Sequence, residues 1–117
     1  MTTRTQKLNA EFKRYISELL MRRVKDPRIT EMFTILEVAT DADLSTAKVY
    51  VSVYSTDTAK ANATFEAICD NEPFIRREIS KNMHIRKVPQ FIFVLDKTMS
   101  YGQKIDDILN EINKKQN

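Results

Sequence analysis

The side chains of this sequence that could do chemistry are mostly basic, and many of them lie between residues 73 and 91. Guanidinium and ammonium groups bind the phosphate oxygens of nucleic acids, and an imidazole can stack on a base or donate to a phosphate. Glu78 is the only acid between Arg76 and Lys87, so the segment carries charge of nearly one sign, which favours a polyanionic partner. The candidate phosphate-binding residues of this segment are Arg76, Arg77, Lys81, His84, Arg86 and Lys87.

The residue types alone leave a second interpretation open, because a run of charge is also typical of a solvated helix face. Lys25 and Arg28 extend the candidate set, since they flank Asp26-Pro27 in a predicted turn. Asp26 and Arg28 could instead pair with each other within that turn. The sequence therefore predicts a basic surface whose core is the segment after residue 73 and whose edge is this turn.

The sequence offers few of the residues that catalysis or metal binding needs. It contains one His, one Cys and one Gly, which excludes multi-His/Cys metal sites and glycine-rich phosphate loops. Cys69 falls near the end of a predicted helix, where a buried apolar role is expected, and Asp106-Asp107 are expected to be solvated. We therefore expect no catalytic residue, no metal, no cofactor and no small-molecule substrate, and we interpret the chain as a non-enzyme.

Length and composition indicate an ordinary folded domain. The chain has 117 residues, of which 42% are hydrophobic and 30% charged, so we expect one domain over residues 1–117 with a core of its own. Its 19 basic and 16 acidic residues give a net charge of +3. This balance permits nucleic-acid binding without requiring it, so the placement of the charges matters more than their sum.

The cellular compartment can be inferred from what the chain lacks. A single cysteine excludes an intramolecular disulfide and favours a reducing compartment. No apolar run reaches the roughly 20 residues of a membrane span, and the polar start lacks the apolar core of a secretory signal. We therefore expect a cytoplasmic protein with no membrane association.

The first half of the chain reads as a helix followed by a hairpin. Apolar residues from Leu8 to Val24 recur at steps of three and four, which predicts a helix that ends before Asp26-Pro27. Residues 33–40 and 46–54 are rich in β-branched and aromatic side chains and are joined by a polar turn, which predicts two antiparallel strands. In the second strand valines alternate with polar residues and tyrosines, so we expect the helices to cover the valine face.

The second half reads as two helices, a strand and a last helix. A helix is expected from Ala59 to Ile68, with an interruption before Pro73. The basic segment then forms a second helix that ends at Val88-Pro89, and residues 91–95 form a third strand. A last helix is expected after residue 100. This order predicts an α+β, two-layer sandwich in which helices cover one side of a three-stranded sheet.

Five segments, each short, together give the chain its resemblance to a known family. These segments are Lys25-Asp26-Pro27-Arg28, Asp43-Leu44-Ser45 followed by Ala47-Lys48-Val49-Tyr50-Val51-Ser52-Val53, Phe74-Ile75-Arg76-Arg77, Ile85-Arg86-Lys87-Val88-Pro89, and Gly102. By the order and spacing of these segments, the chain resembles the ribosome-binding factor A family over nearly its whole length.

The resemblance implies a fold, a function and a partner. It implies a type II KH-like (K-homology) fold of order α-β-β-α-kink-α-β with a C-terminal helix. It implies a monomeric, non-catalytic factor that binds the immature 30S ribosomal subunit and its 16S rRNA precursor, assisting late assembly, 5′-end processing and growth in the cold. The alternatives left open are a general single-stranded RNA-binding KH-type module and a protein-interaction domain with an acidic partner.

The resemblance also locates one departure from the family pattern. The family has a kink, usually written Ala-x-Gly, just before its Phe-Ile-Arg segment. Here Asn71 and Pro73 occupy those two positions. We therefore expect proline chemistry to form the kink, with a sharp start to the basic helix and without a residue at positive φ.

Overall fold

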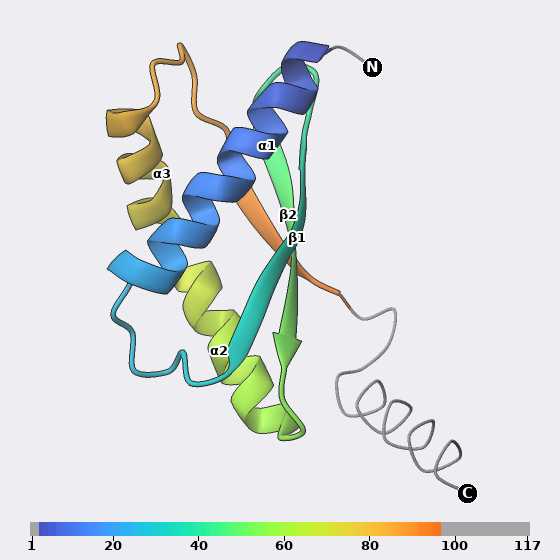
Figure 1. Ribbon diagram of the computed structural model, residues 1–117, viewed down its shortest axis with the longest axis vertical. Coiled ribbons are helices and arrows are strands. Elements are labelled where there is room, and N and C mark those ends of the chain that lie inside the picture. The colour runs from blue at the N-terminus through green and yellow to red at the C-terminus, as the bar shows by residue number, and fades with distance from the viewer. Residues whose placement is uncertain (1–2, 97–117) are drawn as a thin grey trace, which may run out of the picture.

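The structure is a computed structural model that describes residues 3–96, and Figure 1 shows its elements. The chain runs helix, strand, strand, helix, helix, strand. These elements are α1 (Thr3–Glu18) with a π-helical turn η1 (Leu19–Arg23), β1 (Met32–Thr40), β2 (Thr46–Tyr54), α2 (Thr58–Asp70), α3 (Glu72–Asn82) and β3 (Gln90–Leu95). The helix expected after residue 100 lies outside the described residues.

The first helix forms and ends as its apolar pattern predicts. Phe12 and Ile16 are fully buried in the core, and Leu19 and Leu20 continue the buried stripe into η1. Val24 is extended, and its N–H donates to the carbonyl of Leu19 at 2.9 Å. The helix therefore stops before Asp26-Pro27, as expected, and its last turn widens to a π-helix.

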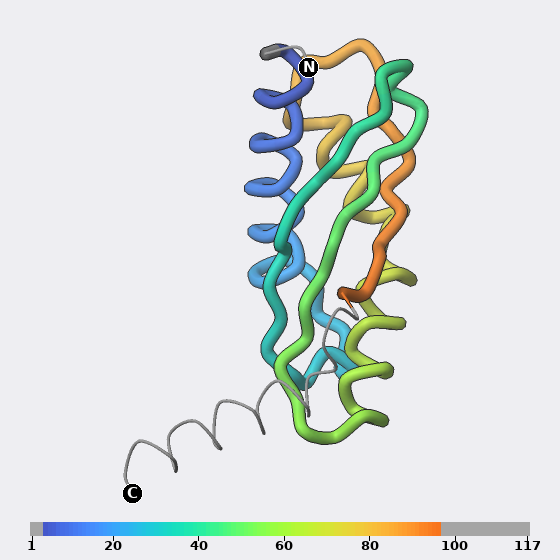
Figure 2. Tube along the Cα trace, turned by 90° about the vertical axis from the view of Figure 1, so that its right-hand side faces the viewer, coloured from blue at the N-terminus to red at the C-terminus, as the bar shows by residue number. Residues whose placement is uncertain are grey.

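The sheet has the order β1-β2-β3, with β1 antiparallel and β3 parallel to β2. Both strands of the predicted hairpin are confirmed to within one residue. The pairing of β1 with β2 shifts between Ile35 and Glu37, so Leu36 is an extra residue in β1. Val49, Val51 and Val53 are fully buried under the helices, and Figure 2 shows all three helices on one side of the sheet.

The α2–α3 kink is made by one residue of bridge-region backbone. Asn71 has φ −90° and ψ 5°, a conformation open to any residue. Its side-chain Nδ2 donates to the carbonyl of Ala67 at 2.7 Å, a carbonyl in the last turn of α2 that also accepts from the backbone N–H of Asn71 at 3.2 Å. Pro73 lies in the first turn of α3, as expected. Among residues 3–96 positive φ occurs at Leu44 and not at the kink.

The helix α3 is shorter than its sequence pattern predicts, and the prediction that it reaches Val88-Pro89 is wrong. It ends at Asn82, whose Nδ2 donates to the carbonyl of Glu78 at 2.7 Å. Met83 is already extended, with φ −107° and ψ 134°. Side-chain amides compete with the helical backbone for its carbonyls, so Asn82 stops the helix. His84, Arg86 and Lys87 consequently lie in a loop.

Phe91, the second residue of β3, ties three elements together. Its ring packs edge-on against Phe12 of α1, with 5.3 Å between ring centroids. Its backbone N–H donates to Oε2 of Glu72, the first residue of α3, at 2.9 Å. These contacts fix where the 83–89 loop returns to the sheet. The described fold is the expected two-layer α+β sandwich with a three-stranded sheet.

Candidate nucleic-acid interface

Two of the three predicted cations on α3 itself are paired with carboxylates of the same helix. An amino group of Arg76 lies 3.5 Å from Oε1 of Glu72, and Nζ of Lys81 lies 3.5 Å from Oε2 of Glu78. Both glutamates are 8% exposed, so they lie beneath the arginine and lysine heads. Arg77 is exposed and forms no ion pair with any other described residue.

Glu78 connects α3 to the first helix. Its Oε1 lies 3.1 Å from Arg23, the last residue of η1, while its other oxygen accepts from Lys81. The sequence pattern gave Glu78 no role beyond that of an isolated acid in a basic run. Side chains three or four residues apart meet on the surface of a helix. This spacing is the local signal that predicts the pairing of Glu78 with Lys81 and of Glu72 with Arg76.

The loop after α3 runs back beside that helix and brings further cations to it. His84, Arg86 and Lys87 are exposed. Arg86 shares a concavity of about 500 Å³ with Arg76 and Arg77 of α3. The structure therefore groups the arginines of the helix with one from the loop, although Arg86 is nine and ten residues away from them in sequence.

The same loop meets the start of α1 and the β1–β2 turn at one end of the molecule (Figures 1 and 2). A second concavity, of about 340 Å³, lies between these three segments; we call it the α1–loop pocket. Arg4 and Lys7 of α1 line it together with three predicted residues, His84, Arg86 and Lys87. Sequence reasoning missed Arg4 and Lys7 because only a long-range contact brings α1 to this loop.

We call the exposed arginine, lysine and histidine side chains at this end the loop-end surface. None of its four arginine and lysine residues outside α3 forms an ion pair within the part of the chain that the structure describes. Lys87 is close enough to Asp43 of the β1–β2 turn to help lower the pKa of that carboxyl, without forming an ion pair with it. Cations that form no ion pair remain available to phosphate. The surface consists of Arg4, Lys7, Arg77, His84, Arg86 and Lys87.

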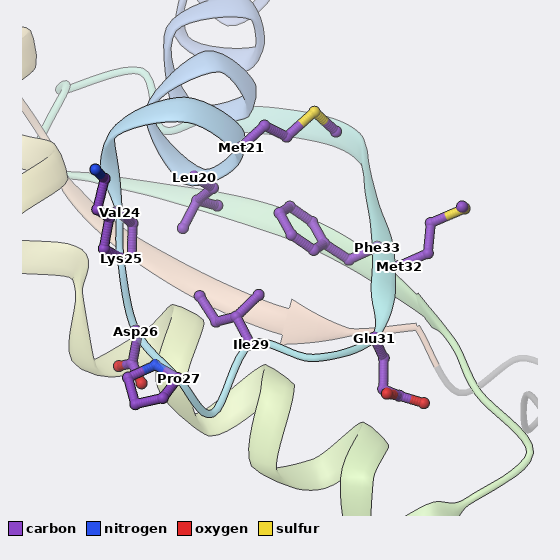
Figure 3. Close-up of a pocket in the computed structure, with 10 residues that line it drawn as sticks. All are labelled: Leu20, Met21, Val24, Lys25, Asp26, Pro27, Ile29, Glu31, Met32 and Phe33. Atoms are coloured by element: carbon purple, nitrogen blue, oxygen red, sulfur yellow. The ribbon is translucent and has the colours of Figure 1, made fainter.

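Lys25 and Arg28 lie elsewhere, on the segment between η1 and β1. Figure 3 shows Lys25 beside Val24 at the edge of a concavity of about 660 Å³. Two exposed methionines, Met21 and Met32, also line this concavity. The structure does not bring Lys25 to the loop-end surface.

Arg28 is bound to two carboxylates from different parts of the chain, in what we call the kink cluster: Asp26, Arg28, Asp70 and Asn71. Its guanidinium lies 2.8 Å from Asp26 and 2.9 Å from Asp70, the last residue of α2. Asn71 donates to Oδ2 of Asp26 at 3.2 Å. The cluster thus ties the 24–31 segment to the α2–α3 junction.

Hydrogen bonding within the kink cluster shifts both ionisations toward the charged forms. The side chain and backbone N–H of Arg28 hold the pKa of Asp26 well below its usual range, and Asn71 adds to the effect. The hydrogen bonds to Asp26 and then Asp70 raise the pKa of Arg28 further above its already high value. Arg28 is therefore a permanently charged member of an internal network.

The described residues also include one cysteine, Cys69. Cys69 is half-buried, and burial raises the pKa of its thiol, which disfavours the reactive thiolate. No cluster of three His, Cys, Asp or Glu side chains suited to a metal ion is present between residues 3 and 96. None of the described helices is both long and apolar enough to cross a membrane.

The fold and this sequence match known proteins. The chain is 40% identical to ribosome-binding factor A of Caldanaerobacter subterraneus subsp. tengcongensis over 99% of this chain and 94% of that one. Its fold is similar to the crystal structure of ribosome-binding factor A from Thermus thermophilus, with a TM-score of 0.68, 21% identity, and coverage of 80% of this chain and 97% of the other.

A second set of coordinates gives a similar likeness. It is a homology model of the Thermus thermophilus ribosome binding factor A fitted into a cryo-EM map of a 30S complex, with a TM-score of 0.60, 21% identity, and coverage of 77% of this chain and 92% of the other. The family description "Ribosome-binding factor A" matches residues 4–109. The chain therefore belongs to the ribosome-binding factor A family.

Proposed function

We propose that this chain is an assembly factor that binds the immature 30S ribosomal subunit through the RNA backbone of its 16S rRNA precursor. In this role it acts in the cytoplasm, where it assists late small-subunit assembly and 5′-end processing of the rRNA. It also supports growth in the cold. Membership of the ribosome-binding factor A family supports the proposal. So does the relative from Thermus thermophilus that was fitted into a 30S complex.

The observation that carries the proposal is the loop-end surface. Its cations come from α1, α3 and the 83–89 loop, and they converge at one end of the molecule. Phosphate contacts of this kind supply affinity and orientation without reading the sequence of the RNA. A factor that recognises the shape of an immature site needs this kind of surface.

The proposed mechanism needs no covalent step. A protein that binds one conformation of an RNA more tightly than another shifts the population toward the bound conformation by its difference in affinity. Preferential binding to the immature subunit would therefore promote one arrangement of the rRNA, and the loss of that arrangement on maturation would release the protein.

In this mechanism the kink cluster positions the surface and does not bind phosphate directly. Arg28 already has two carboxylate partners, and breaking them to reach a phosphate would cost the energy of two charge-assisted hydrogen bonds. Lys25 is free of ion pairs among residues 3–96, and we assign it to the edge of a separate face.

The test measures binding to purified precursor and mature 30S subunits across a salt series. The triple variant Arg77→Ala, Arg86→Ala, Lys87→Ala removes three loop-end cations, and Lys13→Ala, Arg22→Ala, Lys48→Ala removes three exposed cations from other places. For three lost RNA contacts the slope of log affinity against log salt should decrease by roughly 2 to 3. The control should keep the wild-type slope.

Three results would count against the proposal. Equal affinity for precursor and mature subunits would remove the selective part, and equal affinity for unrelated single-stranded RNA would favour a general RNA-binding module. If both triple variants behave like the wild type, the loop-end surface is a solvated face.

A further inference from the structure

The α1–loop pocket has an apolar interior as well as a basic rim. Leu8 of α1, Leu44 of the β1–β2 turn and Ile85 of the loop are half-buried aliphatic residues that line it, above the fully buried ring of Phe12. Its volume of about 340 Å³ is at the small end of the roughly 300–1,000 Å³ typical of ligand sites. A bare anion needs only the rim, whereas a nucleotide also has a flat base to bury.

The backbone at Leu44 supports a built site. Its φ of 61° lies in the left-handed region, which is uncommon for a bulky residue and energetically unfavourable. The turn is held by hydrogen bonds around it: the N–H of Leu44 donates to the carbonyl of Asp41 at 2.9 Å, and Asp43 accepts from the backbone and hydroxyl of Ser45. The fold thus maintains a strained leucine, which glycine would relieve, at the wall of this pocket.

The polar groups of the pocket match the rest of a nucleotide. Arg4, Lys7 and Arg86 form no ion pair with other residues in the described range, so they are available to a phosphate. His84 is exposed, and an imidazole can stack on a base. Glu11 also lines the pocket; its carboxylate would repel a bare phosphate but can accept a hydrogen bond from the exocyclic amine of a base.

We propose that the α1–loop pocket binds one unstacked nucleotide of RNA, with its base against Leu44 and Ile85 and its phosphate on the rim cations. Single-stranded RNA is recognised in this way, by bases that leave the stack and enter protein sites. The proposal rests on the RNA binding proposed above and adds to it a site that holds a base. It adds Leu44 and Ile85 to an RNA-binding surface that already contains Arg4 and Lys7.

The first experiment compares two small probes on the full chain by NMR. Adenosine 5′-monophosphate carries a base with an exocyclic amine, and ribose 5-phosphate has the same sugar and phosphate without the base. We expect the methyl signals of Leu8, Leu44 and Ile85 to shift with AMP. AMP should bind about tenfold more tightly than ribose 5-phosphate, because burying the base against aliphatic side chains removes apolar surface from water.

Two variants separate the base from the phosphate. Leu44→Gly removes an apolar wall at a position where glycine suits the backbone, so the protein should remain folded, lose the preference for AMP and still bind ribose 5-phosphate. Arg4→Ala with Lys7→Ala should weaken both probes. Lys13→Ala with Arg22→Ala, two exposed cations outside the pocket, should change neither.

The outcomes separate this proposal from the function on which it rests. Equal binding of AMP and ribose 5-phosphate would make the pocket an anion site and overturn the proposal. Absence of methyl shifts with either probe, in a protein that still binds precursor 30S subunits, would also overturn it and leave the proposed function intact. Failure of the wild-type protein to bind precursor subunits would remove the proposed function itself.

Discussion

The kink cluster and the loop-end surface both contain arginines on short irregular segments, but only the kink cluster neutralises its charge. Arg28 has carboxylates at 2.8 and 2.9 Å, whereas Arg86 has no carboxylate partner among residues 3–96. Each lies within a motif that the family resemblance rests on, so the sequence presents them as equivalent. In the fold, Arg28 contributes to stability, whereas Arg86 remains available for binding.

The difference arises from where the fold brings acids. Asp70 is 42 residues from Arg28 in sequence, and it reaches the arginine because α2 ends beside the 24–31 segment. The acids of α3 also neutralise some cations and leave others free. Glu72 pairs with Arg76, and Glu78 pairs with Lys81 and Arg23. A count of charges along the chain therefore overestimates the cations that a polyanion can use.

The largest expected effect belongs to the loop-end surface. The double variant Arg86→Ala, Lys87→Ala should weaken binding to precursor 30S subunits by about tenfold or more, because two charge-assisted phosphate contacts are lost. Its free energy of unfolding should stay within about 0.5 kcal/mol of the wild type, as for other exposed substitutions. Filter binding and urea denaturation measure the two quantities. Normal binding would place the RNA contact outside this loop.

A stability effect should follow from the buried carboxylate that holds the start of α3. Glu72→Ala leaves the buried N–H of Phe91 without its acceptor, which should lower the free energy of unfolding by about 1–3 kcal/mol. Glu72→Gln keeps an oxygen acceptor, so its free energy of unfolding should fall less. Urea denaturation of both variants tests this, and equal losses would show that charge, not hydrogen bonding, is what Glu72 contributes.

Much of the fold could be predicted because its signals are local. The alternation of Val49, Val51 and Val53 with polar residues and tyrosines specifies a half-buried strand by itself, and the hairpin was correct to within one residue. The end of α3 was missed because Asn82 stops the helix through a side-chain bond to the backbone, a competition that apolar periodicity does not register.

The candidate site was less predictable for a physical reason. Its members His84, Arg86 and Lys87 could be selected by residue type, but Arg4 and Lys7 join them only through tertiary packing of α1 on the loop. Whether a cation is free also depends on distant carboxylates, as with Arg28 and Asp70. No local pattern contains this information.

A smaller effect should result from changes at Arg28. These changes should lower stability and leave RNA binding unchanged, whereas the loop-end double variant should do the reverse. Arg28→Ala removes the ion pairs to Asp26 and Asp70 and loosens the α2–α3 junction, so the midpoint of thermal unfolding should fall. The midpoint should fall less for Arg28→Lys, since an ammonium keeps the positive charge but cannot bind both carboxylates as the guanidinium does. The salt slope of binding should remain unchanged. A reduced slope would instead make Arg28 a phosphate ligand.

The smallest effect is the contribution of Asp26, in the kink cluster, to the pH dependence of stability. Because folding lowers the pKa of Asp26, the unfolded chain binds its proton at a higher pH than the folded chain does. The stabilisation is therefore complete above the unfolded value, near pH 4, and is lost as pH falls toward the folded value.

Asp26→Asn cannot ionise, so its midpoint of unfolding should fall less steeply between pH 4 and pH 2 than that of the wild type. Calorimetry across that range compares the two slopes, with Asp57→Asn, the cap of α2, as the matched carboxylate control. Parallel slopes for Asp26→Asn and the wild type would mean that the network around Arg28 persists when Asp26 is protonated, and the contrast with the loop-end surface would then rest on Asp70.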